Sequence, residues 1–143
     1  MPPTLQREFS LFDGGAAIVV ALVFILVASL AKEPVRQKFN AIFVAGAGAA
    51  YLSGGLGPWE FAFTTVATLV AYKGLASYRF IGLAWMLHVG WDIVHHFYGN
   101  PIVSFAPTSS GQCAVCDTLI AFWFFAGAPS VYERRPLATG SAV

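Results

Sequence analysis

Long apolar segments alternate with short polar connections along the chain, and this pattern predicts five membrane-spanning helices. A spanning helix needs about 20 mainly apolar residues, within a range of about 17–25. Each segment is followed by a Pro, a Gly or charged residues, which favour a turn. We therefore expect an all-α polytopic membrane protein, a single five-helix transmembrane domain over residues 1–143, with the spans 14–31, 40–56, 59–76, 80–98 and 112–132.

The basic residues indicate how the spans are oriented, because cytoplasmic connections of membrane proteins carry an excess of Lys and Arg. Arg7 lies ahead of the first span. With five spans, the other seven of the eight basic residues fall on the opposite side of the membrane: Lys32, Arg36, Lys38, Lys73, Arg79, Arg134 and Arg135. We predict an external N-terminus and a cytoplasmic C-terminus, whereas four spans would break this pattern.

The composition fits a chain whose surface contacts membrane lipid. Hydrophobic residues make up 57% of the chain and charged residues 10%. A net charge of +1 without a basic stripe excludes nucleic acid as a partner. Arg7, Glu8 and Asp13 precede the first apolar segment, so we expect a retained span rather than a cleaved signal. Five short helices enclose little volume, which favours a homo-oligomer or a larger membrane complex.

Small residues form a pattern in the second segment. Gly46, Ala50 and Gly54 recur at four-residue spacing, with Gly48 beside them. Small side chains at this spacing let helix backbones approach closely in lipid. We interpret these residues as a helix-packing face.

All three histidines lie within LHVGWDIVHHFYGNP, residues 87–101, an otherwise mainly apolar stretch. Consecutive helical residues are about 100° apart, so this stretch places four ionisable side chains within an arc of roughly 100°. They are His88, Asp92, His95 and His96. Such side chains are costly in hydrocarbon, usually face a bundle interior and often mark functional sites. The predicted topology brings the end of this helix to the external surface.

A second cluster opens the fifth segment, where the CxxC pair Cys113 and Cys116 is followed by Asp117. The topology brings this cluster to the same external surface as His95 and His96. CxxC fits half of a zinc site, a thiol–disulfide couple or incidental packing. A His pair at the same depth favours mixed thiolate and imidazole coordination.

We therefore predict that both clusters form one metal site near the external membrane face. Zinc is expected first, and copper or iron would accept parts of the same ligand set. Asp92 is also the candidate general base of a metal-dependent reaction. One tetrahedral ion cannot bind every candidate, so some orient the others or there are two sites. The candidate ligands are His88, Asp92, His95, His96, Cys113, Cys116 and Asp117.

Three neighbouring features have open roles. Asp13 and Glu60 begin the first and third segments on the predicted external side. There, an acid is either simply stabilised by the helix dipole or joins the cluster, and the turn before Glu60 would allow the second. The apolar connection at residues 98–111 either covers the mouth of the site or docks a partner protein.

Three segments of the chain have a distinctive sequence: RQKFNAIFVAGAGAAYLSGGLGPWE, YRFIGLAWMLHVGWDIVHHFYGNPIV, and PTSSGQCAVCD with AFWFFAGAPS. Together they resemble a family of small bacterial integral membrane proteins known only as a domain of unknown function. The resemblance extends from about residue 31 to about residue 132. It implies a multi-pass protein of the bacterial inner membrane and implies no activity.

The first expectation for function is therefore a metal-binding membrane protein, with metal-dependent catalysis open. The outward-facing CxxC is also similar to that of membrane quinone-linked thiol oxidases, which implies thiol–disulfide exchange, although their second cysteine pair is missing here. A non-catalytic structural or assembly subunit of a membrane complex is the third alternative. An open coordination position on the metal would favour catalysis, and a closed four-ligand site would favour a structural role.

Overall fold

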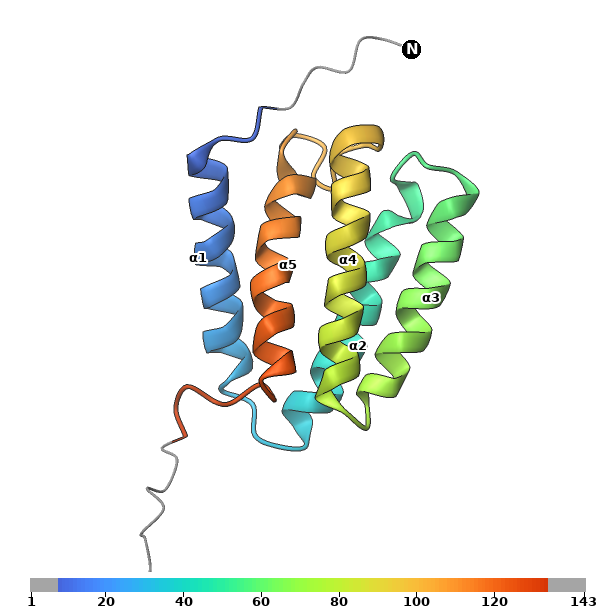
Figure 1. Ribbon diagram of the computed structural model, residues 1–143. Coiled ribbons are helices and arrows are strands. Elements are labelled where there is room, and N and C mark those ends of the chain that lie inside the picture. The colour runs from blue at the N-terminus through green and yellow to red at the C-terminus, as the bar shows by residue number, and fades with distance from the viewer. Residues whose placement is uncertain (1–7, 134–143) are drawn as a thin grey trace, which may run out of the picture.

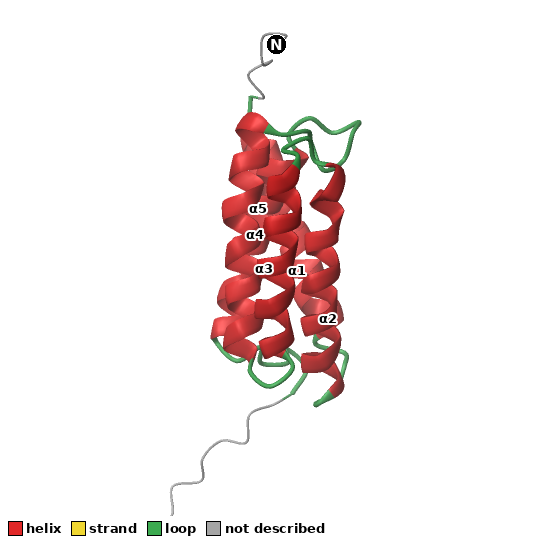
Figure 2. Cartoon of the chain, turned by 90° about the vertical axis from the view of Figure 1, so that its right-hand side faces the viewer, coloured by secondary structure: helices red, strands yellow, loops and turns green. Residues whose placement is uncertain are grey.

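The computed structural model describes residues 8–133, which form five α-helices and one short 3-10 helix (Figure 1). These residues contain no strand, so the predicted all-α class and the number of helices are confirmed. Consecutive α-helices run in opposite directions and form an up-and-down bundle (Figure 2). The elements are α1 Leu11–Ala28, α2 Val35–Ala49, η1 Ala50–Ser53, α3 Pro58–Gly74, α4 Tyr78–Tyr98 and α5 Ser109–Phe125.

Local backbone features explain why two helix boundaries differ from the apolar pattern. α1 begins at Leu11, ahead of residue 14, because Ser10 and Asp13 form a capping box. In this box each side chain accepts a hydrogen bond from the other residue's backbone N–H. α5 ends well before residue 132 because Gly127 and Ala128 both adopt a positive φ, which cannot continue a right-handed helix. The hydropathy pattern alone reveals neither the capping box nor the positive φ angles.

α4 lies at the centre of the bundle and packs against α5, α3 and α2, while α1 packs along α5 (Figure 1). Small side chains at these contacts let the helices approach closely. This central position places the ionisable residues of α4 inside the bundle. The most deeply buried apolar residues of the core are Ala21, Val44, Ala71, Ile81, Ala84, Ala121, Phe124 and Ala128.

The packing face of α2 differs from the one predicted. Ala50 is exposed, and a Cβ placed on Gly46 would meet nothing within 4 Å among the described residues. Gly48 instead faces α3 and α4, and Gly54 lies against the ring of His95. Four-residue spacing could not distinguish between adjacent registers in a segment so rich in small residues.

The basic residues of the described part all lie at one end of the bundle. This is the end where α1 connects to α2 and α3 connects to α4 (Figure 1). The residues concerned are Lys32, Arg36, Lys38, Lys73 and Arg79. The three other basic residues, Arg7, Arg134 and Arg135, lie outside the described residues.

One helix between residues 8 and 133, α1, is long and apolar enough to cross a membrane by length and composition. Its mean hydropathy is 2.5 over 18 residues. Because α1 lies near the N-terminus, a signal sequence would meet the same criterion. The five-span topology therefore stays a prediction.

Candidate functional site

The ionisable face of α4 points into the bundle. The exposed fractions of His88, Asp92 and His95 are 1%, 0% and 0%. His96 is half-buried beside them. Buried polar groups are costly unless they are paired, so the partners of these three side chains define what the site can do.

Asp92 joins α4 to η1 and to α5. Its Oδ1 accepts a short hydrogen bond from the hydroxyl of Tyr51. The carboxyl group of Asp117 lies close enough to interact with that of Asp92. Two carboxyl groups and a phenol therefore meet inside the bundle, a combination that either shares protons or attracts a cation.

A cavity of about 200 Å³ lies between α2, η1, α4 and α5. Four polar side chains line it: Tyr51, His88, Cys113 and Asp117. Together with Asp92, which lies behind Tyr51 and Asp117, we call these residues the central cluster. The apolar part of the lining comes from Phe43, Ala47, Ala50, Trp85 and Ile102.

His88 has one ring nitrogen engaged and one without a partner. The imidazole hydrogen-bonds to the backbone of Val44 on α2. Nε2 has no hydrogen-bond partner among the described residues, so this bond uses Nδ1. A backbone carbonyl can only accept, which means that Nδ1 carries the proton. A neutral His88 therefore keeps the lone pair of Nε2 available for a ligand.

His95 belongs to a different pair. Its Nε2 lies 3.2 Å from Oε2 of Glu60 on α3, and its Nδ1 lies 3.3 Å from the carbonyl oxygen of Asn100. The ring also packs on Tyr51, with 4.8 Å between ring centroids. Tyr51 thus connects this pair to the central cluster.

The two other predicted ligands do not line the cavity of the central cluster. His96 packs edge-on against Phe9 and lines a separate, largely apolar hollow between α4 and α5. Cys116 is buried in the apolar core, whereas Cys113 lines the cavity. Both cysteines are free thiols.

The seven predicted ligands are therefore divided in the structure. His88, Asp92, Cys113 and Asp117 come together, while His95, His96 and Cys116 have other surroundings. Residues 8–133 contain no group of three or more His, Cys, Asp or Glu side chains placed to hold a metal ion. Metal binding would thus require side chains of the central cluster to rotate toward one another.

Tyr51 is the residue of the central cluster that sequence reasoning missed. It follows the run of small residues in α2, at the point where the helix tightens into η1. A lone tyrosine in an apolar segment gives little signal of its own. The sequence also leaves the partner of Glu60 undecided, because an acid at this helix N-terminus either joins the cluster or is simply stabilised by the helix dipole.

Asp13 and the connection before α5 are tied together at the same end of the bundle. Oδ1 of Asp13 accepts hydrogen bonds from Thr108 at 2.8 Å and from Gln112 at 2.7 Å. Ile102 reaches the cavity from this connection. Asp13 therefore caps α1 and also fixes the start of α5. The connection before α5 covers part of the cavity.

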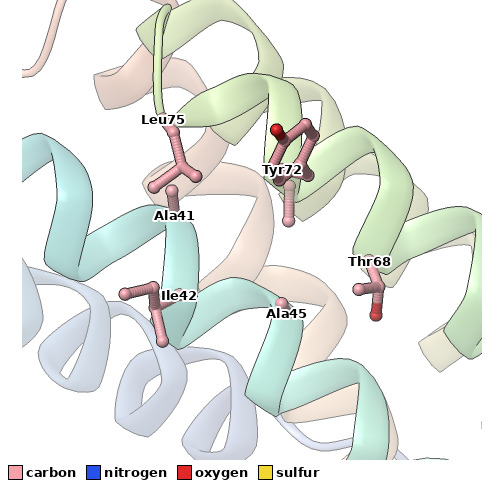
Figure 3. Close-up of a pocket in the computed structure, with 7 residues that line it drawn as sticks. Ala41, Ile42, Ala45, Thr68, Tyr72 and Leu75 are labelled. Carbon is pink, nitrogen blue, oxygen red and sulfur yellow. The ribbon is translucent and has the colours of Figure 1, made fainter.

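A second hollow, of about 170 Å³, lies between α2 and α3 (Figure 3). Its lining is Ala41, Ile42, Ala45, Thr68, Ala71, Tyr72 and Leu75, with no His, Cys, Asp or Glu. The cavity of the central cluster differs from this hollow, because His88, Cys113 and Asp117 line it.

These observations define the class of the molecule as an all-helical bundle with a cluster of ionisable groups in its interior. The chain belongs to DUF6010, a family of unknown function whose model matches residues 14–130. The predicted resemblance to such a family is thereby confirmed. The comparisons with curated proteins and with solved structures give no match. Function must therefore be argued from the site.

Proposed function

We propose that the protein crosses a membrane five times, with its N-terminus outside and its C-terminus in the cytoplasm. The bacterial inner membrane implied by the sequence resemblance is part of this proposal. Large exposed apolar side chains on every helix support it, because soluble monomers rarely expose extensive apolar surface. Examples from α1 to α5 are Leu22, Ile42, Leu69, Ile93 and Phe122.

Helix length and charge add support for this topology. The 21 residues of α4 correspond to about 31 Å, which matches a hydrocarbon layer of about 30 Å. η1 extends α2 by four residues. The basic residues gathered at one end of the bundle are arranged as the positive-inside rule requires of a cytoplasmic end.

Single cysteines in the full chain would test this topology. Ala76→Cys and Phe105→Cys, each in a Cys113→Ser/Cys116→Ser background, place a thiol at opposite ends of the bundle. A membrane-impermeant maleimide should label position 105 in intact cells and position 76 only after lysis. Labelling of both positions in intact cells, or release of the chain from membranes by alkaline carbonate, would contradict the proposal.

We further propose that the central cluster binds a divalent metal ion, with zinc first. The observation that carries this proposal is the unpartnered Nε2 of buried His88, a residue that lines a cavity together with Cys113 and Asp117. A histidine that ligates a metal usually donates its other ring N–H to a carboxylate or backbone carbonyl, as His88 does to Val44.

The donor set also agrees with zinc. An imidazole nitrogen, a thiolate sulfur and a carboxylate oxygen are all common zinc ligands. Three protein ligands leave a fourth position for water or substrate, which is the arrangement of catalytic rather than structural zinc sites. Asp92 and Tyr51 would then hold Asp117 in place, so Asp92 is a positioning residue rather than a ligand in this arrangement.

Metal content of the detergent-purified protein tests the site. The wild type should carry close to one zinc per chain, and His88→Ala, Cys113→Ser and Asp117→Asn should each lose most of it. His96→Ala is the matched control, because His96 lines a different hollow. A control that loses as much metal as the cavity variants would place the metal elsewhere.

A metal-free wild type would overturn zinc binding. If Cys113 and Cys116 then titrate as a disulfide, the thiol–disulfide alternative becomes the better account. If they titrate as free thiols, the central cluster is a buried polar network and the structural-subunit alternative is favoured.

A further inference from the structure

The cavity of the central cluster extends from mid-height of the bundle, at His88, to the end where α4 connects to α5, at Ile102. His88, which forms part of its floor, is the middle residue of α4 and lies about 15 Å along the axis from either end. α2 and α5 flank the cavity, and each packs on α4. Phe43, near the middle of α2 and η1, lines the cavity and is 44% exposed, so this side of the cavity faces lipid chains in a hydrocarbon layer of about 30 Å.

The lining of the cavity changes from apolar side chains at the surface of the bundle to hydrogen-bonding side chains in its interior. Phe43 on α2 and Ala50 on η1 are exposed, and Ala47 between them is half-buried. His88 and Tyr51 lie deeper and are almost fully buried. A molecule that follows this path meets an apolar opening first and hydrogen-bonding groups last.

The chemistry of the inner end selects the head group. Nδ1 of His88 donates to the Val44 carbonyl, so the free Nε2 is an acceptor and requires a donor from the ligand. A volume of about 200 Å³ is below the usual 300–1,000 Å³ of sites for drug-sized molecules. The cavity therefore accommodates a small head group, and a longer apolar chain would remain between the helices and the lipid.

We propose that this cavity binds a lipid-soluble molecule with a small hydroxyl head, which reaches His88 from the bilayer through the gap between α2 and α5. This inference goes beyond the proposed function and concerns the metal-free cavity, because the lone pair of Nε2 cannot accept a hydrogen bond from a hydroxyl while it coordinates a metal. It rests on the proposed membrane location.

Cys113 is a natural reporter because it lines the cavity. The test uses the full chain with Cys116→Ser, reconstituted in phosphatidylcholine vesicles and treated with a chelator. Labelling of Cys113 by N-octylmaleimide is compared with labelling by a maleimide that carries a trimethylammonium group, each relative to its rate in detergent-unfolded protein. The alkyl reagent should react at least about tenfold faster, since a fixed charge is excluded from hydrocarbon.

The head group is tested by protection of Cys113. Dodecan-1-ol in the vesicles should slow labelling by N-octylmaleimide, and dodecane at the same mole fraction should not. His88→Ala should abolish protection by dodecan-1-ol while Cys113 still reacts with the alkyl reagent. Equal protection by alcohol and alkane, or protection that persists without His88, would overturn the hydroxyl assignment.

Two matched variants on α2 test the route. Ala47→Phe adds a large side chain to the cavity lining and should slow alkyl labelling several-fold. Ala49→Phe adds the same side chain at an exposed position outside the lining and should have no effect. Faster labelling by the charged reagent, or no labelling by either reagent, would overturn the lipid-side route. Metal content is measured separately on untreated protein, so failure of zinc binding is distinguishable from failure of this proposal.

Discussion

Nε2 of His95 lies 3.2 Å from Oε2 of Glu60, and both side chains are almost completely buried. The same carboxylate accepts from the indole N–H of Trp91 at 3.1 Å and from the backbone N–H of Leu56 at 3.0 Å. Three donors thus surround one carboxylate at the junction of α3, α4 and the turn before α3. This pairing holds that end of the bundle together, next to the central cluster.

Removal of Glu60 should destabilise the protein strongly. Glu60→Ala leaves His95 and the Trp91 N–H without their acceptor inside the bundle, and each buried group left unsatisfied costs about 1–3 kcal/mol. Glu60→Gln keeps one acceptor oxygen and should cost less. Thermal unfolding in detergent measures both, with exposed Glu133→Ala as the control. If Glu60→Ala and Glu133→Ala unfold at the same temperature, the pair has no structural role.

Gly54 should not tolerate a side chain. A Cβ there would collide with the His95 ring and lie 2.7 Å from Oε1 of Glu60, so Gly54→Ala forces the pair apart. We expect a loss of about 1–3 kcal/mol, as for other overpacked sites. Gly46→Ala is the matched control, because its added Cβ has open space and alanine favours a helix by up to about 1 kcal/mol. Unfolding temperatures that fall equally in both variants would show that contact with His95 is not the cause.

Loss of the Tyr51 hydroxyl should destabilise the central cluster through Asp92. Tyr51→Phe removes the donor to Oδ1 of Asp92, whose Oδ2 has no hydrogen-bond partner among residues 8–133. An unsatisfied buried acceptor costs about 1–3 kcal/mol. Tyr72→Phe, on the exposed face of α3, should be neutral.

A double-mutant cycle separates this hydrogen bond from general packing effects. With Asp92→Asn as the second change, the free energies of unfolding of the two single variants should not add. Additive effects would show that Tyr51 and Asp92 are energetically independent.

Tyr78 should ionise at unusually high pH. Burial and, next to it, the hydrogen bond to Glu33 together raise the pKa of Tyr78 to about 12, against a smaller lowering by Arg36. A raised pKa in the folded state stabilises the protein fully below the ordinary value of 10.0, and this contribution is lost as pH rises towards about 12. Wild type should therefore lose stability relative to Tyr78→Phe over this interval.

Ultraviolet absorbance of phenolate follows this titration directly, as the difference between wild type and Tyr78→Phe. Glu33→Gln should move the transition to lower pH, because the carboxylate that opposes ionisation is removed. A Tyr78 transition at the ordinary value of 10.0 in wild type would contradict the arrangement of Glu33, Arg36 and Tyr78 at this end of the bundle.

Several features of the fold were predictable because they depend on residues close together in the chain. Apolar segments and intervening turns predicted five helices, and five helices are present between residues 8 and 133. Helical spacing predicted that His88, Asp92 and His95 share one face, and all three point into the bundle. The Ser10–Asp13 cap and the positive φ of Ala128 were not anticipated, although both are local features of the chain.

Which residues form the central cluster depends on how the helices pack against one another. Spacing placed Cys113 and Cys116 near each other on one helix, but the rotation of α5 against α4 directs Cys113 to the cavity and Cys116 into the apolar core. Likewise, the pairing of Glu60 with His95 depends on how α3 docks against α4.

The order of the residues fixes which side chains share a face of each helix, because the helical repeat is a property of the backbone alone. Which of these faces meet depends on how the helices dock against one another. Helix rotation depends on close packing of small residues such as Gly48 of α2, and several registers of a small-residue helix look alike in the sequence. For that reason the central cluster with Tyr51 emerged only when the five helices were packed together.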